Sequence, residues 1–229
     1  MTTPPVLAHC EQVTRVFGTG ATAVVAVRDV SCEVLAGQRV AIMGPSGSGK
    51  STLLHLLAGL DAPTSGAVTW PAIGRQEELR PGPVAVVFQG PSLLPPLDVA
   101  ENVTLPLLLA GATRTAARAA AEAALDRLAL SSLASKLPEE LSGGQAQRVA
   151  VARVLAGRPR LVLADEPTGQ LDFATGATVI DALMEAVDHL DAALVVTTHD
   201  PRTAARLSTR WTMADGELLD TAVVVACSS

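Results

Sequence analysis

The chain has 229 residues, a length at the upper edge of one domain or of one domain with an inserted subdomain. Its 48% hydrophobic and 17% charged residues are typical of a globular protein with a substantial core and exclude a disordered chain. The formal net charge of −6 argues against nucleic acid as a partner, because broad, sequence-independent binding to it requires a basic surface. A small anion site built from backbone N–H groups is still compatible with this charge.

The cysteines and the apolar stretches indicate a cytoplasmic chain. Cys10, Cys32 and Cys227 are odd in number and lack metal-ligand spacing, so we expect free thiols in a reducing compartment. The N-terminal residues lack the basic start and apolar run of a signal peptide. No stretch reaches the ~18 apolar residues of a membrane span. We therefore expect no direct membrane insertion, and contact with a membrane only through a partner.

The first part of the chain alternates between short apolar runs and turn formers. Residues 6–33 form short alternating segments broken by a Gly-Thr-Gly loop at 18–20, which predicts strands joined like a hairpin. Residues 39–43 are typical of a strand buried on both faces, and an apolar helical pattern follows at 52–60. Residues 66–80 are polar and rich in turn formers, which predicts turns.

The rest of the chain predicts a helical insertion between buried strands. A strand is expected at 84–88, after which prolines at positions 91, 95, 96 and 106 predict a loop region. A long Ala-rich helix is expected at 114–130, within a segment that we interpret as an inserted helical subdomain. Apolar runs at 161–164 and 193–197 predict two more buried strands. This alternation of strands and helices indicates an α/β fold with a mostly parallel central sheet.

Residues 44–52, GPSGSGKST, fit the pattern G-x-x-x-x-G-K-[ST] of a phosphate-binding loop. The glycines let the backbone curl so that its N–H groups form a concave anion site at a helix N-terminus. Lys50 can reach the β- and γ-phosphates of ATP, and Ser51 can supply a hydroxyl ligand to Mg²⁺. A strand precedes the loop and a helix follows it, which favours a nucleotide site over an ordinary glycine-rich turn. The residues expected to bind ATP here are Gly44, Ser46, Gly47, Ser48, Gly49, Lys50, Ser51 and Thr52.

Two carboxylates, Asp165 and Glu166, directly follow the apolar run at 161–164. Alone, such a pair is more often a solvated strand end. After a phosphate-binding loop, however, an Asp in this place holds Mg²⁺ and a following Glu can polarise the attacking water. We assign Asp165 to the metal and Glu166 to the general base.

The pentapeptide Leu-Ser-Gly-Gly-Gln at 141–145 resembles the signature motif of ATP-binding-cassette (ABC) ATPases. A serine hydroxyl and glycine N–H groups at the positive end of a helix suit a phosphate. The resemblance implies that this motif contacts the γ-phosphate bound to the other subunit of a dimer. The residues concerned are Ser142, Gly143, Gly144 and Gln145.

Four further positions resemble the other motifs of this family, in family order. Gln89 resembles the glutamine that senses Mg²⁺ and water and links to a membrane partner. Asp172 resembles the aspartate that reaches across the dimer, and His199 resembles the histidine that donates to the γ-phosphate. Phe17 lies where an aromatic residue stacks on adenine, although one aromatic near a strand is often a core residue. With Lys50 and Glu166, the resemblance makes Gln89 and His199 the catalytic set, and Gln89 joins Ser51 and Asp165 as a metal ligand.

The resemblance implies a single ABC nucleotide-binding domain over 1–229, with a P-loop NTPase (RecA-like) core and a mostly parallel sheet. It also implies an antiparallel β-subdomain, with the core and β-subdomain at about 1–89 and 147–229. The inserted α-helical subdomain is expected at about 90–146. Motifs around residues 88–106 and 163–169 resemble the branch of lipoprotein-releasing, macrolide-exporting and cell-division ATPase subunits.

Such a subunit hydrolyses MgATP as a homodimer or a cassette heterodimer and drives a separate integral-membrane permease. It is peripheral on the inner face of the cell membrane. The chain departs from this branch in a segment at 66–84 that is shorter than usual, and in Phe17 where tyrosine is the usual residue.

Three other classes of ATP-binding protein are alternatives to a transporter subunit. A regulatory ATPase that signals to a cell-wall enzyme without transport would carry the same motifs. A DNA- or ribosome-acting ATPase usually carries coiled coils, zinc modules, tandem cassettes or basic surfaces, which this sequence lacks. A kinase conflicts with the signature motif and has no candidate acceptor-binding region.

Overall fold

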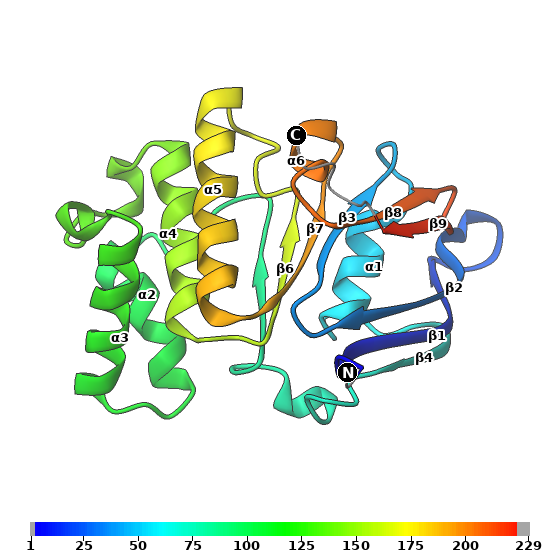
Figure 1. Ribbon diagram of the computed structural model, residues 1–229, viewed down its shortest axis with the longest axis horizontal. Helices are drawn as coiled ribbons and strands as arrows, with labels where there is room; N and C mark the ends of the chain where they lie inside the picture. The colour runs from blue at the N-terminus through cyan, green and yellow to red at the C-terminus, as the bar shows by residue number, and fades with distance from the viewer. Residues whose placement is uncertain (1–2, 224–229) are drawn as a thin grey trace.

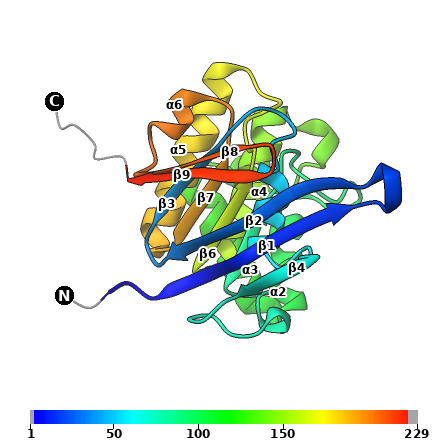
Figure 2. The same cartoon turned by 90° about the vertical axis from the view of Figure 1, so that its right-hand side faces the viewer.

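Two β-sheets with different strand arrangements position the functional site (Figures 1 and 2). The computed structural model describes residues 3–223, so Cys227, expected as a free thiol, lies outside the described residues. Cys10 and Cys32 are free thiols, as expected. The larger sheet has the order β5-β6-β7-β3-β8-β9, and its pairs are parallel except for β8 with β9. Its strands are β3 (Arg39–Met43), β5 (Val84–Val87), β6 (Leu161–Asp165), β7 (Ala193–Thr197), β8 (Thr209–Ala214) and β9 (Glu217–Val223).

The strands predicted from apolar runs are β5, β6, β7 and β3, and they are consecutive neighbours in the larger sheet. Every residue of β7 is buried, as are the first four residues of β6. Such uniform burial follows from a parallel sheet that is covered on both faces, and it explains the continuous apolar runs. The prediction of an α/β fold with a mostly parallel sheet is therefore confirmed.

The smaller sheet is antiparallel and has the order β2-β1-β4. Its strands are β1 (Val6–Phe17), β2 (Val24–Leu35) and β4 (Ser65–Thr69). β1 and β2 form the predicted hairpin, with the 3-10 turn η1 (Gly20–Thr22) in its loop. The prediction of turns was wrong for the first residues of 66–80, which belong to β4. Its side chains are mostly exposed, so main-chain pairing with β1 defines this strand and no apolar pattern marks it.

Helices cover both faces of the larger sheet (Figure 1). On one face, α1 (Lys50–Leu57) shares a hydrophobic core with the smaller sheet. On the other face, α4 (Gly143–Ala156) and α5 (Phe173–Leu190) share a second core with α2 (Val99–Leu109) and α3 (Arg114–Arg127). Within residues 3–223, no helix is both long and apolar enough to cross a membrane. The remaining helical elements are α6 (Pro201–Ala204), η2 (Gln76–Glu78), η3 (Ser131–Leu133) and η4 (Pro138–Glu140).

Helix α2 contains Pro106, which the sequence analysis placed in a loop, so that prediction was wrong. The carboxylate of Asp98 accepts from the N–H of Glu101 (2.8 Å), and the carboxylate of Glu101 accepts from the N–H of Asp98 (3.0 Å). This reciprocal cap fixes the start of the helix. Val99 and Val103 in the first two turns are fully buried. Capping and burial together hold the helix, although the proline removes one backbone donor.

The pairing of β4 with β1 depends on glycine at position 66. Its φ is +80°, and a Cβ there would overlap the carbonyl oxygens of Glu11 and Gln12. We expect Gly66→Ala to lower the free energy of unfolding by about 2–4 kcal/mol, because backbone strain and overlap both oppose a side chain. Gly20 has φ +60° with open space around it, so Gly20→Ala should cost only about 1 kcal/mol. Urea denaturation measures both variants, and equal losses would contradict the prediction.

Candidate nucleotide and catalytic site

The predicted phosphate loop, acidic pair and His199 lie where β3, β6 and β7 end. These strands are parallel, and in the sheet β7 lies between β6 and β3. The carboxyl ends of parallel strands meet at one edge of the sheet, which is where open α/β sheets bind ligands. The phosphate loop at 44–52 follows β3, the acidic pair follows β6, and residues 198–200 follow β7.

The phosphate loop requires glycine at its closest approaches to the rest of the chain. Gly44, Gly47 and Gly49 have φ values of 154°, 80° and 98°. A Cβ on Gly49 would overlap the carbonyl oxygen of Ala26, and one on Gly44 would overlap that of Met213. The glycines therefore allow a positive-φ backbone and close packing at once, as the sequence pattern indicated. The loop leads into α1, whose first-turn N–H groups have no partner within the helix.

Two polar side chains of this loop fit an anionic ligand. Lys50 is 5% exposed, and its Nζ donates to the carbonyl oxygens of Gly44 (3.0 Å) and Pro45 (2.9 Å). Ser48 is 3% exposed, and its buried hydroxyl has no hydrogen-bond partner. A buried hydroxyl without a partner is costly, and a phosphate oxygen would satisfy it. The residues of the loop therefore fit the phosphates of a nucleotide.

Asp165, at the end of β6, accepts hydrogen bonds from hydroxyl groups on α1 and β7. Its Oδ1 accepts hydrogen bonds from the hydroxyl of Ser51 (2.8 Å) and from that of Thr197 (2.7 Å). The Nε2 of His55, one turn along α1 from Ser51, lies 3.7 Å from Oδ2. A carboxylate and a hydroxyl this close, beside a phosphate loop, supply the hard oxygen ligands that Mg²⁺ takes together with substrate phosphates. The donor set fits the expected Mg²⁺ at Ser51 and Asp165.

Glu166 is held in a left-handed backbone conformation with φ +40°. Its N–H donates to the hydroxyl (2.8 Å) and to the carbonyl oxygen (3.2 Å) of Thr197, which fixes this conformation. Its carboxylate lies between two cationic or basic groups. Oε1 is 3.9 Å from Nζ of Lys50, and Oε2 is 3.6 Å from Nδ1 of His199, a side chain that is 67% exposed. A residue held at positive φ in a polar cluster is typical of functional sites.

Gln89 also approaches this cluster. A Cβ built on Gly169 would lie 3.1 Å from Nε2 of Gln89 and 3.2 Å from Oε2 of Glu166. Both side chains therefore converge above Gly169, which leaves room for them. The structure thus brings together all four residues that the sequence analysis placed in the catalytic set.

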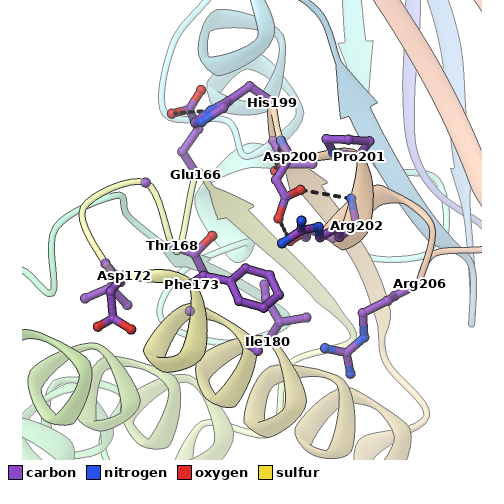
Figure 3. A pocket seen from close by; sticks show the side chains of 16 residues that line it. Glu166, Thr168, Asp172, Phe173, Ile180, His199, Asp200, Pro201, Arg202 and Arg206 are labelled. Atoms are coloured by element: carbon purple, nitrogen blue, oxygen red, sulfur yellow. Dashed lines mark hydrogen bonds and ion pairs between the residues drawn. The ribbon is translucent and has the colours of Figure 1, made fainter.

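A cavity of about 500 Å³ adjoins Glu166 and His199 (Figure 3). It lies between α5 and α6, and Arg202 and Arg206 line the wall that faces α5. Phe173 at the start of α5 is 63% exposed, and the guanidinium carbon of Arg202 lies 4.4 Å from the centre of its ring. The sequence analysis gave no role to these arginines or to Phe173.

The signature residues cap α4 and lie apart from the phosphate loop. The hydroxyl of Ser142 accepts from the N–H of Gln145 (3.3 Å), and the side chain of Gln145 accepts from the N–H of Ser142 (2.9 Å). Gly143 and Gly144 pack against the loop before α5 and against α5 itself, and a Cβ on Gly144 would overlap Thr175. Lys50 begins α1 on one face of the larger sheet, whereas Ser142 caps α4 on the opposite face. A single chain therefore leaves this motif separate from its own phosphate loop.

Two other predicted ligand residues lie at element ends. Asp172 caps α5, and hydrogen bonds from the side chain and backbone of Thr175 lower the pKa of its carboxyl, which is therefore ionised at neutral pH. Phe17 ends β1 and is 43% exposed, so it is no core residue. The guanidinium carbon of Arg15 lies 4.5 Å from the centre of its ring.

Thr197 is the residue that sequence reasoning missed. It is fully buried and contacts both Asp165 and Glu166, although the sequence predicted it only as the last residue of the buried strand at 193–197. Its signal was its place at the carboxyl end of the run 193–197, because the strand beside β6 must present its last side chain to the acidic pair. The contact itself required the register, in which Asp165 and Thr197 are paired.

A phosphate loop on a parallel sheet, with a carboxylate pair at the end of a strand two positions away and a loop hydroxyl bonded to the first carboxylate, defines a P-loop nucleotide-binding protein. Comparison with known proteins narrows this class. The family profile described as "ABC transporter" matches residues 27–169. The chain belongs to the ABC transporter family, as an ATP-binding ATPase subunit whose expected activity is ATP hydrolysis.

Individual relatives agree with this assignment. The lipoprotein-releasing system ATP-binding protein LolD of Shewanella oneidensis is 41% identical over 220 residues, 93% of this chain and 96% of the relative. LolD of Legionella pneumophila is 43% identical over 209 residues, 88% of this chain and 92% of the relative. A dimeric post-hydrolysis state of the ATP-binding cassette MJ0796, bound to ADP and Pi, is 34% identical with a TM-score of 0.85. That alignment covers 96% of this chain and 100% of the other, and the predicted family, branch and P-loop fold are confirmed.

Thr197→Val tests the buried hydroxyl that links β7 to the acidic pair. The substitution keeps the shape of the side chain but removes a donor to Asp165 and an acceptor for the N–H of Glu166. We expect the free energy of unfolding to fall by about 1–3 kcal/mol, because buried polar groups lose their partners. Thr178→Val is the control: its hydroxyl bonds only to Ala174 in an exposed turn of α5, and the loss should stay within about 0.5 kcal/mol. Chemical denaturation that gives the same loss for both would refute the role of Thr197.

Proposed function

We propose that the chain binds and hydrolyses MgATP as one of two cassettes that close around two nucleotides and drive a separate transmembrane permease. The observation that carries this proposal is the convergence of Lys50, Ser51, Asp165, Glu166 and His199 at adjoining strand ends. These are the groups that phosphoryl transfer to water requires: a phosphate cradle, metal ligands and a base beside them. We further propose that residues 90–146 form a helical subdomain on a core made of about 1–89 and 147–229.

The chemistry divides among the residues at the strand ends. The phosphate loop binds the phosphates through its N–H groups and Lys50, and Ser51, Asp165 and Gln89 hold the metal. Bound Mg²⁺ supplies positive charge that neutralises the phosphates. Glu166 accepts the proton of the attacking water, and His199 donates a hydrogen bond to a γ-phosphate oxygen. The distances from Glu166 to Lys50 (3.9 Å) and His199 (3.6 Å) support these roles, since the three groups surround one space.

The dimer supplies the groups that a single chain keeps apart. Ser142, as the N-cap of α4, presents a hydroxyl and first-turn N–H groups to the γ-phosphate bound by the second chain, together with Gly143, Gly144 and Gln145. Asp172 reaches across the dimer, and Phe17 stacks on adenine. The separation of Ser142 from Lys50 within one chain supports this arrangement, and the dimeric state of the cassette MJ0796 is its structural parallel.

The membrane side of the proposal follows from the relatives. The relatives are ATP-binding proteins of lipoprotein-releasing systems, which favours transport over signalling to a cell-wall enzyme. We propose that this chain serves a permease of that type from the cytoplasmic face of the membrane. Gln89 and the helical subdomain carry movement to the permease.

Glu166→Gln separates hydrolysis from ATP-driven dimerisation. The amide keeps the size and the hydrogen-bonding acceptor of Glu166 but cannot take a proton at neutral pH. We expect kcat to fall at least about 100-fold while ATP still binds, because general-base catalysis is lost. Light scattering should then show the monomer mass without nucleotide and twice that mass with MgATP.

Two further variants make this result specific. Glu185→Gln removes an exposed carboxylate from α5 and should keep wild-type turnover. Ser142→Arg on the Glu166→Gln background should still bind ATP but stay monomeric, because the long cation fills the place of the second γ-phosphate. Wild-type turnover of Glu166→Gln would show that another group is the base. A monomer at saturating MgATP would rule out the closed dimer for the isolated chain.

A further inference from the structure

Two side chains of helix α4 form hydrogen bonds with the segment Phe88–Ser92, which carries Gln89. This segment follows β5 directly and forms neither helix nor strand. Its backbone carbonyls therefore depend on other partners, and three of them receive hydrogen bonds from α4. Ser92 has φ +44°, a conformation that a non-glycine residue keeps only where surrounding contacts hold it.

Gln147 makes the first of these contacts. Its side chain is 2% exposed, and Nε2 donates to the carbonyl oxygen of Phe88 at 2.9 Å. Phe88 is bonded through the chain to Gln89, so this contact fixes the peptide unit from which the Gln89 side chain projects. A buried amide that lost this acceptor would be costly, which makes the contact persistent.

Arg153 makes the second contact, two turns further along α4. Its guanidinium donates to the carbonyl oxygen of Ser92 (2.9 Å), to the hydroxyl of Ser92 (3.1 Å) and to the carbonyl oxygen of Pro91 (3.4 Å). Burial lowers the pKa of Arg153, but an arginine side chain stays charged. Its planar fork thereby holds the far end of the segment by charge-assisted hydrogen bonds.

Helix α4 joins these contacts to the signature motif. At 1.5 Å per residue, Gln147 lies about 8 Å and Arg153 about 16 Å along the helix from its cap, Ser142. Figure 1 shows α4 between the helical insertion and α5. Its inner residues are buried along its whole length, which opposes local fraying and favours displacement of the helix as one rigid unit.

We propose that Gln147 and Arg153 are positioning residues that make the placement of Gln89 follow the position of α4. This inference rests on the proposed function, in which Ser142 binds the nucleotide of the second chain. When Ser142 closes on that nucleotide, α4 shifts, and the two side chains carry Phe88–Ser92 with it. Gln89 then takes its working place at its own chain's nucleotide only when the other site is also closed. Turnover at the two sites is thereby linked through one helix in each chain.

The test compares Gln147→Met and Arg153→Met with a matched control. Methionine keeps the side-chain volume but removes the donors. Arg148→Met is the control, because Arg148 on the same helix also donates to a backbone carbonyl, that of Leu128 (2.6 Å), away from the segment. Each variant is made in the full chain with active Glu166, for kinetics and thermal unfolding. Each is also made in the Glu166→Gln background, for hydrogen exchange of the amides at 88–94 and 44–52 with and without MgATP.

We expect Gln147→Met and Arg153→Met to lower kcat by about tenfold or more and to change KM for ATP less than twofold, since misplacement of a catalytic group by about 1 Å has such effects. MgATP should slow exchange at 44–52 in every variant. It should slow exchange at 88–94 in the parent and in Arg148→Met but not in the two test variants. Arg153→Lys should recover part of the kcat, because it restores one charged donor.

Three outcomes would overturn the inference. The first is that kcat and exchange at 88–94 in the two test variants equal those of Arg148→Met. The second is that MgATP protects both segments equally in all variants. The third is that KM rises as much as kcat falls. If Gln147→Met fails to fold, the pair Arg153→Met and Arg153→Lys decides alone. Failure of the parent Glu166→Gln to dimerise with MgATP would instead refute the proposed function, so the two failures are distinguishable.

Discussion

The parallel pairing of β3, β7 and β6 is the constraint on which the site depends. In this register Thr197 is paired with Asp165 on one side and with Ile42 on the other. The last residues of three strands therefore end side by side, and the chain after each of them must turn at the same edge. The phosphate loop, the acidic pair and residues 198–200 meet for this reason, although they come from distant parts of the sequence. A shift of one residue in either pairing would turn the side chains of a whole strand to the opposite face.

The charged side chains at this edge of the sheet leave Lys50 able to bind an anionic ligand. Lys50 is buried and donates to carbonyl oxygens of its own loop, while Glu166 lies at 3.9 Å and Asp165 is satisfied by two hydroxyls. Carbonyl oxygens are weaker partners for an ammonium group than phosphate oxygens. Nucleotide binding would therefore exchange modest contacts of Lys50 for stronger ones. The unpartnered hydroxyl of Ser48 agrees with this reading.

In the proposed mechanism, helix α4 links two sites, one at its cap and one along its length. Its cap presents Ser142 outward, and the side chains of the buried Gln147 and the half-buried Arg153 hold the segment before α2. A helix serves this purpose because its backbone hydrogen bonds keep side chains many residues apart in fixed relation. A loop of the same length would lose the relation between the two sites.

The sequence by itself determined the phosphate loop, the acidic pair and the signature motif, because each is local: the spacing of a few residues sets their chemistry. It also determined the buried strands of β6 and β7, whose apolar runs follow from burial on both faces. Only the tertiary structure decided the rest. β4 is defined by main-chain pairing with β1, and α2 forms across Pro106 because of its cap and the buried Val99 and Val103. The contacts of Thr197, Gln147 and Arg153 join residues 31 to 62 positions apart, and no periodicity records such pairs. Strand register and helix packing bring them together, and these arise only when the whole core forms.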